Sequence, residues 1–498
     1  MHLRCAMYPK TARQILMPEE FFLPFGGKLN SENRWVKLAA LIPWWELEER
    51  YAKHFKSPRR GEQAFTVRVA LGTLIIQTRM NLSDRETVNQ IIENPYLQYF
   101  LGFDRYEDRK TPFDPSMLVH FRKRLSDDVL MEVNDLIAKD AASTKAKKDK
   151  DDDDTPTSSG GSVSEKMDKD ENQGQLILDA TCAPGDIRFP TDVRLLNEAR
   201  EKLEQMIDIL HSPDAGVKTK PRTYRKKARS NYLSLEKQRK KHKKTIRKVL
   251  RKQLAYVGRN LKIIDRYLEA EVNRTGLLSK TQREHLETIR ALYDQQQTMY
   301  QTKTHSVQNR IVSITQPHLR PIVRGKAGAD VEFGCKVMTS VVNGYSFIEH
   351  MSFDSFNEGN YLKLAVENYK KRFGCYPESV MADTIFRTRE NRAWLKENGI
   401  RMSGPKLGRP SKTLEKAQKE QEKKDTGIRN AVEGTYGNAK RKFGLDCIKA
   451  KLKETAESSI VLQFLVLNLE RRLRVLLFHF FKRLFSGTNN WEFAVVSG

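Results

Sequence analysis

The sequence has few cysteines, and their spacing does not match a structural zinc site or a disulfide framework. The five cysteines in 498 residues lie far apart and form no CxxC pair, which argues for a reducing compartment. The histidines are scattered and no HExxH motif occurs, so zinc chemistry is not indicated. Glycine-rich phosphate loops are absent too, since GVKTK at 216–220 is not a Walker motif. We therefore expect no nucleotide cofactor.

Long apolar runs are also missing. The first residues contain no apolar signal core, and a membrane span needs about 18 uninterrupted apolar residues. The one candidate, Ile460 to Phe485, is interrupted by Glu470, Arg471, Arg472, Arg474 and Lys482. We read this segment as a core helix, with an oligomer interface as the alternative. No membrane partner is expected, and the predicted location is the cytoplasm, in association with the nucleoid.

Positive charge is abundant. The formal net charge is +26 and the sequence pI is about 9.7. A charge of this size attracts a polyanion, which is usually nucleic acid, with an anionic membrane surface as the rival partner. The length is sufficient for two or three domains with a sizeable core.

Residues 1–140 have the pattern of short capped helices. Ser83 and Glu86 have capping-box spacing, and Asp114-Pro115 resembles an N-cap followed by proline at the first helical position. The next helix is basic and ends this predicted N-terminal DNA-binding domain. A helix-turn-helix binder and a plain helical bundle fit the segment equally well. The candidate DNA contacts on this helix are Arg122, Lys123 and Arg124.

Two further segments stand out by composition. Residues 141–174 contain almost no apolar side chains and are predicted to be a disordered acidic and polar linker. Residues 193–302 form a predicted helical insertion, in which 218–262 contains 19 Lys and Arg against one acid. That density suits a phosphate backbone, and the candidate contacts are Lys240, Lys241, Lys243 and Lys244. A coiled-coil seam is predicted from Leu250, Leu254, Val257, Leu261, Ile264 and Leu268.

The remaining segments, 175–192 and 303–486, alternate between strand and helix patterns, and 487–498 is a predicted tail. The apolar run Leu176 to Leu178 ends at Asp179, and the run Ser379 to Ala382 ends at Asp383. Between them, alternating residues on both sides of Asn343-Gly344 predict a hairpin. The expected fold is α+β and multidomain, with a mixed sheet covered by helices. Its element order is that of an RNase H-like domain with a helical insertion.

Three carboxylates could carry chemistry. Asp179 and Asp383 are predicted at the carboxyl ends of strands, where active sites of open sheets gather. Glu433 follows on a helix, with Arg429 and Lys440 on its face. Mg²⁺ fits such a carboxylate set, and two ions could assist displacement at phosphorus. Asp186 and Asp192 are set aside, the first as a loop residue and the second as a helix N-cap.

The motifs resemble the DDE transposases of bacterial insertion sequences, which have an RNase H-like catalytic domain. The similarity rests on LSDRETVNQIIENPYLQYFLGFD and PFDPSMLVHFRKRL near the N-terminus, and then on LILDATCAPGDIRFPTDVRLL, ESVMADTIFRTRENRAWLKENGIR and RNAVEGTYGNAKRKFGL. The resemblance implies that Asp179, Asp383 and Glu433 bind Mg²⁺ (or Mn²⁺), and that Arg429 and Lys440 contact DNA. Many such enzymes have a tyrosine three positions before the arginine, where this sequence has Thr426.

The sequence thus predicts a transposase that binds the terminal inverted repeats of its own element and joins the cut ends to target DNA. The resemblance implies at least a homodimer, because two DNA ends must be held together. Two rivals remain: a structure-specific nuclease of the same fold, and a transposase-derived DNA-binding protein without catalysis. A basic scaffold or an RNA-binding protein would explain the charge but not the three carboxylates.

Overall fold

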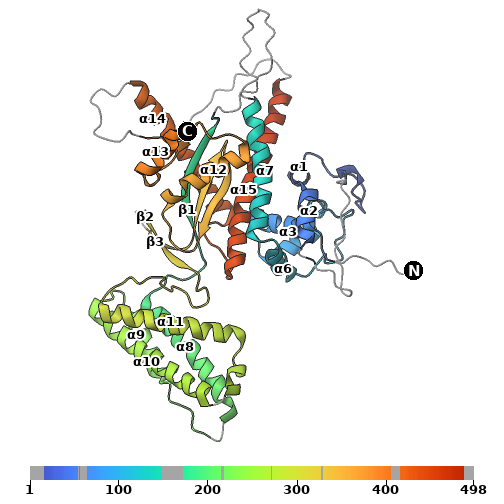
Figure 1. Cartoon of the computed structure of the whole chain (residues 1–498). Helices are drawn as coiled ribbons and strands as arrows, with labels where there is room; N and C mark the ends of the chain where they lie inside the picture. Colours follow the sequence, from blue (N-terminus) through green and yellow to red (C-terminus); the bar gives the residue numbers. More distant parts are fainter. Residues whose placement is uncertain are drawn as a thin grey trace, which may run out of the picture.

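The protein is a mixed α+β chain whose helices outnumber its strands. The computed structural model describes residues 16–53, 55, 64–148, 172–214, 218–270, 272–326, 329–404 and 416–486. Figure 1 shows a central sheet with helices on both faces, a separate group of helices below it, and the N-terminal helices beside it. Most of the predicted linker and the predicted tail lie outside the described residues.

The N-terminal helices form one compact group. Ser83 caps a helix as predicted, since its hydroxyl accepts from the Glu86 amide at 3.2 Å. The prediction for Asp114 was wrong: its carboxylate accepts from the Ser116 amide at 2.8 Å, and the helix begins only at Met117. The helices are α1 (Arg34–Leu41), α2 (Trp44–Ala52), α3 (Val67–Met80), α4 (Asp84–Glu93), α5 (Pro95–Phe100) and α6 (Met117–Arg124).

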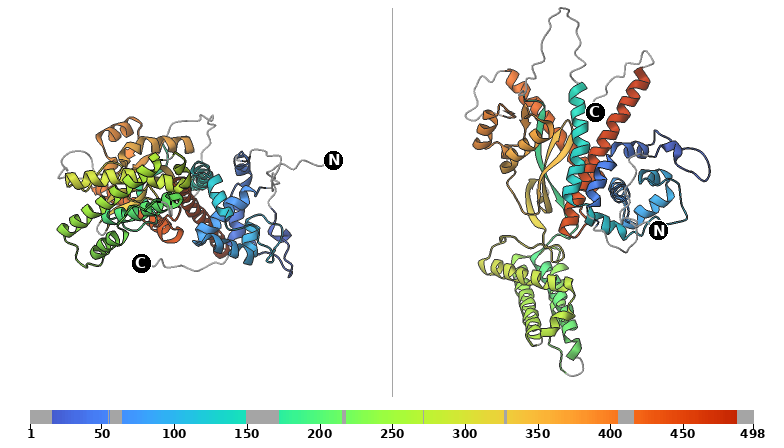
Figure 2. Two further views of the ribbon diagram at one scale, coloured as in Figure 1. Left: turned by 90° about the horizontal axis from the view of Figure 1, so that it is seen from below. Right: turned by 45° about the vertical axis from the view of Figure 1, so that its right-hand side comes forward.

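Two long helices join this group to the sheet. Helices α7 (Asp127–Lys148) and α15 (Lys453–Ser486) lie side by side between the N-terminal helices and the sheet (Figures 1 and 2). The buried Asn468 amide donates to Asn134 Oδ1 at 2.8 Å and to the Ser346 carbonyl at 2.7 Å. These bonds fix the register of the two helices against the sheet.

Helix α15 is a core helix over its first half, as predicted. Ile460, Phe464 and Leu469 are at most 1% exposed. They belong to the same apolar cluster as the N-terminal helices, so the two regions share one core. Within the described residues, no helix is long and apolar enough to cross a bilayer.

The sheet is mixed, and its long strands are at the centre. The strands are β1 (Gln175–Pro184), β2 (Arg320–Lys326), β3 (Ala329–Val342), β4 (Tyr345–Ser352), β5 (Ser379–Met381) and β6 (Arg401–Met402). Their order is β2-β3-β1-β5-β6, and β4 also pairs with β3. β1 is antiparallel to β3 and parallel to β5, which is parallel to β6. The predicted turn is present, with Asn343 at φ 50° and Gly344 at φ 83°, angles that suit a tight hairpin.

Each face of the sheet has its own helices because side chains alternate along a strand. Leu176 and Leu178 pack with α12 (Leu362–Phe373) and α13 (Arg389–Glu397) on one face. Ile177 belongs to the cluster of α14 (Lys416–Phe443) and α15 on the other. Asp179 is two residues after Ile177 on the same strand, so its side chain points to the same face of the sheet, toward α14.

The helical insertion has an apolar core of its own. It contains α8 (Asp192–His211), α9 (Arg225–Glu236), α10 (Lys243–Ala270) and α11 (Lys280–Thr302). The predicted seam residues Leu254, Val257, Leu261 and Ile264 are buried, and α10 packs against α8, α9 and α11. Helix α10 therefore has three helical neighbours, more than the single partner of a two-stranded coiled coil. Asp192 is not the N-cap, because the Thr191 hydroxyl accepts from the Arg194 amide. The insertion also contains the short 3-10 helices η2 (Ser212–Asp214) and η3 (Val272–Leu277), and another, η1 (Pro18–Glu20), precedes α1.

Gly334 marks the closest approach of β3 to β1. A Cβ at this position would lie 2.1 Å from the backbone oxygen of Ala183. Since backbone cannot move aside cheaply, we expect Gly334→Ala to lower the free energy of unfolding by about 1–3 kcal/mol. Gly427→Ala is the matched control, because that exposed glycine in α14 has no neighbour within 4 Å and alanine should stabilise the helix by about 0.5–1 kcal/mol. Thermal and urea unfolding measure both, and equal stability of the two variants would contradict the close packing.

Candidate active site

Asp179 lies within β1, and the predicted strand end was wrong. The strand continues to Pro184 because β3 pairs with it up to Pro184 opposite Gly334. On its other side the parallel pairing with β5 ends at Ile177 opposite Met381. Asp179 therefore comes two residues after the last β5 pair, at the sheet edge that β5 leaves open. Its side chain is half-buried and accepts from the Ala180 amide at 2.8 Å.

Asp383 lies just after β5, as predicted. It caps the short helix η5 (Thr384–Phe386), and its carboxylate accepts from the Thr384 amide at 2.7 Å. Arg429 of α14 pairs with this carboxylate, with 2.9 Å between Nη1 and Oδ1. Asp383 is 58% exposed, so the pair stands open to solvent beside the end of β5.

Glu433 is held between two contacts of α14 with the sheet. One turn before it, Arg429 pairs with Asp383. One turn after it, the buried Tyr436 hydroxyl lies 2.5 Å from Thr339 Oγ1, and Thr339 is the cross-strand partner of Asp179. The Glu433 side chain is exposed. Its backbone position therefore lies on the face of the sheet that carries the two aspartates.

A further carboxylate, Glu358, was not predicted from the sequence. It begins the short helix η4 (Glu358–Tyr361) and pairs with Lys336 at 2.9 Å, with both side chains largely buried. Asn391 ties η4 to η5, since its Nδ2 donates to the carbonyls of Gly359 at 2.8 Å and Phe386 at 2.9 Å. The helix that carries Glu358 is thus fixed against the helix that Asp383 caps.

The charges of this cluster act on Asp179. Burial raises the pKa of the Asp179 carboxyl, the charges of Glu358 and Asp383 raise it further, and the Ala180 amide and Arg429 act against them. Like charges close together favour a bound cation. Asp179 and Asp383 fit this requirement, although among the described residues no three His, Cys, Asp or Glu side chains form a ready-made metal site.

Two family comparisons cover parts of the chain. Residues 380–470 match the family described as Transposase DDE domain, and residues 24–124 match the Transposase domain (DUF772). The first match contains Asp383, Arg429 and Glu433. Two separate segments of the chain are thus similar to transposase domains. The predicted relationship to insertion-sequence DDE transposases is thereby confirmed, and these domains support a transposase function with DNA binding.

A curated relative is similar over part of the chain. The uncharacterized protein ORF8 of the nfe locus of Rhizobium meliloti is 27% identical over 175 residues, which is 35% of this chain and 73% of that protein. No solved structure matches the chain.

The predicted DNA contacts on α6 differ in their surroundings. Arg122 pairs with Asp84 and donates to Gln77 Oε1 at 2.8 Å. The Arg124 guanidinium lies 4.8 Å from the centre of the Phe55 ring. Lys123 is exposed. The structure thus uses two of these cations to hold the helices together and leaves Lys123 facing solvent.

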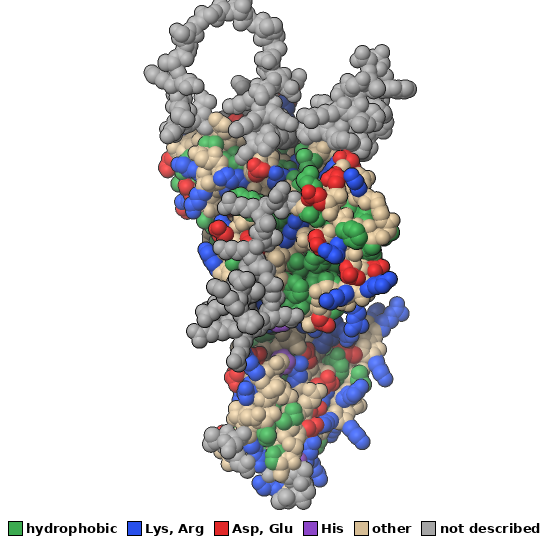
Figure 3. Space-filling model, turned by 90° about the vertical axis from the view of Figure 1, so that its right-hand side faces the viewer, with side chains coloured by type: hydrophobic (Ala, Val, Ile, Leu, Met, Phe, Trp, Pro, Cys, Tyr) green, Lys and Arg blue, Asp and Glu red, His purple; other side chains and the backbone are tan. Residues whose placement is uncertain are grey.

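The predicted DNA contacts in the insertion gather at one turn between α9 and α10. Lys240 and Lys241 lie between α9 and α10, and Lys243 and Lys244 open α10. All four are exposed, and Lys241 pairs with Glu236 at 2.9 Å. Cations are unfavourable at the positive end of a helix, so this turn would gain from a bound anion. Figure 3 shows Lys and Arg side chains along one edge of the helical insertion, in the lower part of the view.

The raised pKa of Asp179 gives a test of the carboxylate cluster. Because the folded pKa exceeds the ordinary value of 3.8, the folded state binds a proton more tightly than the unfolded state, and ionisation costs stability as pH rises above 3.8. Asp179→Asn removes this cost. In EDTA, we expect its stability advantage over wild type to grow with pH from 3.8 up to the raised pKa and then to stay constant. Thermal unfolding across pH measures it, and an advantage that does not change with pH would show that the cluster exerts no such repulsion.

Proposed function

We propose that this chain is a DDE transposase that binds terminal inverted repeats and catalyses metal-dependent DNA cleavage and strand transfer. The observation that carries the proposal is the position of Glu433 on α14, between the partner of Asp383 and the hydrogen bond to the strand neighbour of Asp179. Three carboxylates from separate segments of the chain would then converge on one face of the sheet.

The proposed catalytic fold is RNase H-like. Its support is the central β1, antiparallel to β3 on one side and parallel to β5 on the other. The proposed domains are a helical DNA-binding domain at 1–140, an acidic linker at 141–174, a catalytic domain at 175–192 and 303–486 followed by a tail at 487–498, and a basic insertion at 193–302. The coiled-coil character of that insertion stays a prediction.

Asp179, Asp383 and Glu433 would hold two Mg²⁺ or Mn²⁺ ions, which supply Lewis-acid stabilisation to an in-line displacement at phosphorus. The residues around them would place the DNA. Arg429 Nη1 lies 2.9 Å from Asp383 Oδ1, and a DNA phosphate would compete for this guanidinium. Lys440 lies on the same side of α14 as Arg429, with its Nζ 4.0 Å from Glu332 Oε1. It would contact the DNA backbone farther along the duplex.

DNA would also bind away from the carboxylates. Contacts from α6 would select the inverted repeat, and phosphate contacts from the basic turn of the insertion would hold the duplex. The proposed contacts are Arg122, Lys123, Arg124, Lys240, Lys241, Lys243 and Lys244. Two ends held at once require a homodimer in the synaptic complex, and the DNA bound outside transposition would keep the protein with the nucleoid.

Two other functions fit part of this arrangement. A structure-specific nuclease would use the same carboxylates and release its product without joining it. A transposase-derived DNA-binding protein would need only the cations. The carboxylate cluster around Asp179 favours an enzyme, because a binder gains nothing from holding acids together at a cost in stability.

The test is incubation of the purified chain with Mg²⁺ and DNA that carries the flanking inverted repeats. We expect wild type to cut at the repeat ends and to join them to target DNA. Asp383→Ala and Glu433→Gln should bind the same DNA while the cleavage rate falls by about 10²- to 10³-fold, as for the loss of an electrostatic stabiliser in an active site. Gel analysis of cleaved and joined products measures both steps.

Asp294→Asn is the matched control, since this exposed carboxylate lies on α11 of the insertion. It should cut like wild type. Equal cleavage by Asp383→Ala and wild type would reject the assignment of the carboxylates. Cleavage without joining would favour the nuclease, and binding without cleavage by wild type would favour the non-catalytic protein.

A further inference from the structure

The loop between α14 and α15, residues 444–452, is anchored to the end of β1. The Ile448 amide donates to the Pro184 carbonyl at 2.7 Å, and the Asp186 amide donates to the Ile448 carbonyl at 3.1 Å. Gly185 and Ile448 form an isolated parallel bridge, and the side chains of Leu445 and Ile448 are buried. The loop is therefore a fixed part of the sheet's surroundings.

Two lysines project from this fixed base. Lys449 and Lys451 are exposed, and neither forms an ion pair within the described residues. Other cations nearby are neutralised: Arg122 pairs with Asp84, and Arg194 pairs with Glu236 at 3.6 Å. Unpaired cations on a rigid backbone keep their full charge for a ligand.

On one side of the loop is a cleft shared with the N-terminal helices. Its volume is about 490 Å³, and it is lined by α6 residues including Lys123 and by loop residues including Lys449 and Lys451. Gln463 also lines it, and this side chain is 8% exposed with an Oε1 that has no hydrogen-bond partner in the structure. The cleft is therefore cationic and contains an unused polar atom.

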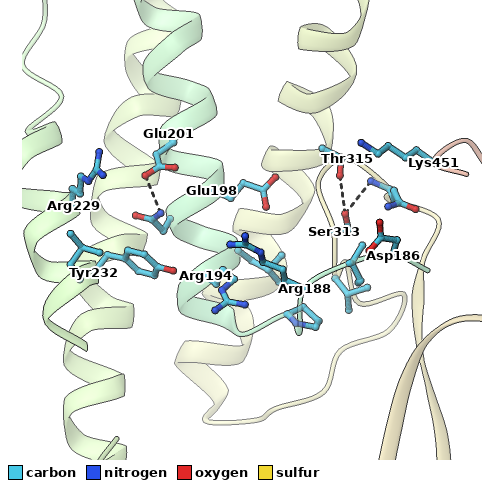
Figure 4. Close-up of a pocket in the computed structure, with 17 residues that line it drawn as sticks. Asp186, Arg188, Arg194, Glu198, Glu201, Arg229, Tyr232, Ser313, Thr315 and Lys451 are labelled. Atoms are coloured by element: carbon cyan, nitrogen blue, oxygen red, sulfur yellow. Dashed lines mark hydrogen bonds between the residues drawn. The ribbon is translucent and has the colours of Figure 1, made fainter. Parts of the chain in front are cut away.

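On the other side of the loop is a second cleft, shared with the helical insertion. Its volume is about 580 Å³, and Lys451 lines it together with Arg188 after β1 and with Arg229 and Tyr232 of α9. Figure 4 shows Lys451 on one side of this cleft and Arg229 with Tyr232 on the opposite side. Arg188 and Arg229 are exposed and have no ion pair within the described part of the chain.

Most of the acidic side chains in the second cleft form ion pairs with basic residues. Glu198 pairs with Lys202 at 3.8 Å, and Glu201 pairs with the buried Arg200 at 3.0 Å. Asp186 is the exposed acid that stands beside the cations. The unpaired charge of the cleft is therefore positive.

We infer that the 444–452 loop is a DNA-backbone contact that joins the two basic regions. One duplex would pass over Lys123 of α6 and over Lys449 and Lys451, and would continue to Arg188 and Arg229 at the insertion. Lys451 belongs to both clefts, so it is the link between them. Duplex DNA carries one negative charge per about 1.7 Å of its axis, which matches a row of fixed cations rather than a single anion site. This inference rests on the proposed function and adds the path of its substrate.

The test measures the salt dependence of binding to a duplex of arbitrary sequence by fluorescence anisotropy. Each lost phosphate contact lowers the slope of log K against log salt concentration by about 0.9. We expect Lys449→Ala with Lys451→Ala to lower the slope by about 2 and to weaken binding roughly 10- to 100-fold at 0.1 M salt. Lys449→Arg with Lys451→Arg should restore the slope, because both cations return.

The matched control is Lys371→Ala with Lys396→Ala, which removes two exposed charges in the last turns of α12 and α13. An unchanged slope in the loop variant, or an equal loss in the control, would overturn the inference. The triple variant with Lys123→Ala should lose about one further contact, and no further loss would remove α6 from the path. If wild type binds no duplex at all, the proposed function fails with it; if wild type binds and the loop variant is unchanged, only the path fails.

Discussion

The position of α14 on the sheet is the constraint on which the candidate site depends. Two contacts on either side of Glu433, the ion pair of Arg429 with Asp383 and the hydrogen bond between Tyr436 and Thr339, fix the position and the rotation of this helix. Because a helix turns 100° per residue, a small rotation would carry Glu433 off the sheet face. The flanking apolar residues Val432 and Ala439, both buried, oppose such a rotation.

The ionised carboxyl of Asp179 on the same face of the sheet lowers the stability of the fold. Burial and the charges of Glu358 and Asp383 raise the pKa of the Asp179 carboxyl. Hydrogen bonds between uncharged groups oppose this repulsion. Those of Asn391, for example, hold η4, η5 and α13 together. A carboxyl pKa raised by burial and by neighbouring acids is typical of sites that bind an ion or a substrate.

Much of the architecture followed from local patterns. Alternating residues and Asn343-Gly344 predicted the hairpin, and the short apolar run before Asp383 predicted a strand, because both signals depend on neighbouring residues only. β1 extended beyond its apolar run because β3 supplied a partner for residues that resemble a loop. The edge strand β2, which contains Pro321, carries no such local signal and was missed.

Contacts between side chains that are far apart in the sequence could not be predicted from it. The pairing of Arg122 with Asp84 joins two helices, and nothing in the basic pattern of α6 distinguishes Arg122 from Lys123. Glu358 was not predicted as a site residue, because its nearness to Asp179 depends on how β4 returns along β3. Charge density predicted candidate DNA-binding regions, but it could not show which of their cations form ion pairs within the fold.

The helical insertion has a consequence for how the chain folds. β1 pairs with β3 only after the chain has passed through α8, α9, α10 and α11, and closing such a long loop from an unstructured state is entropically costly and slow. The insertion's separate core allows these helices to form first and to bring their two ends together. The sheet that carries the carboxylates would then assemble late, so an incomplete nascent chain would contain a folded basic insertion before it contained an active site.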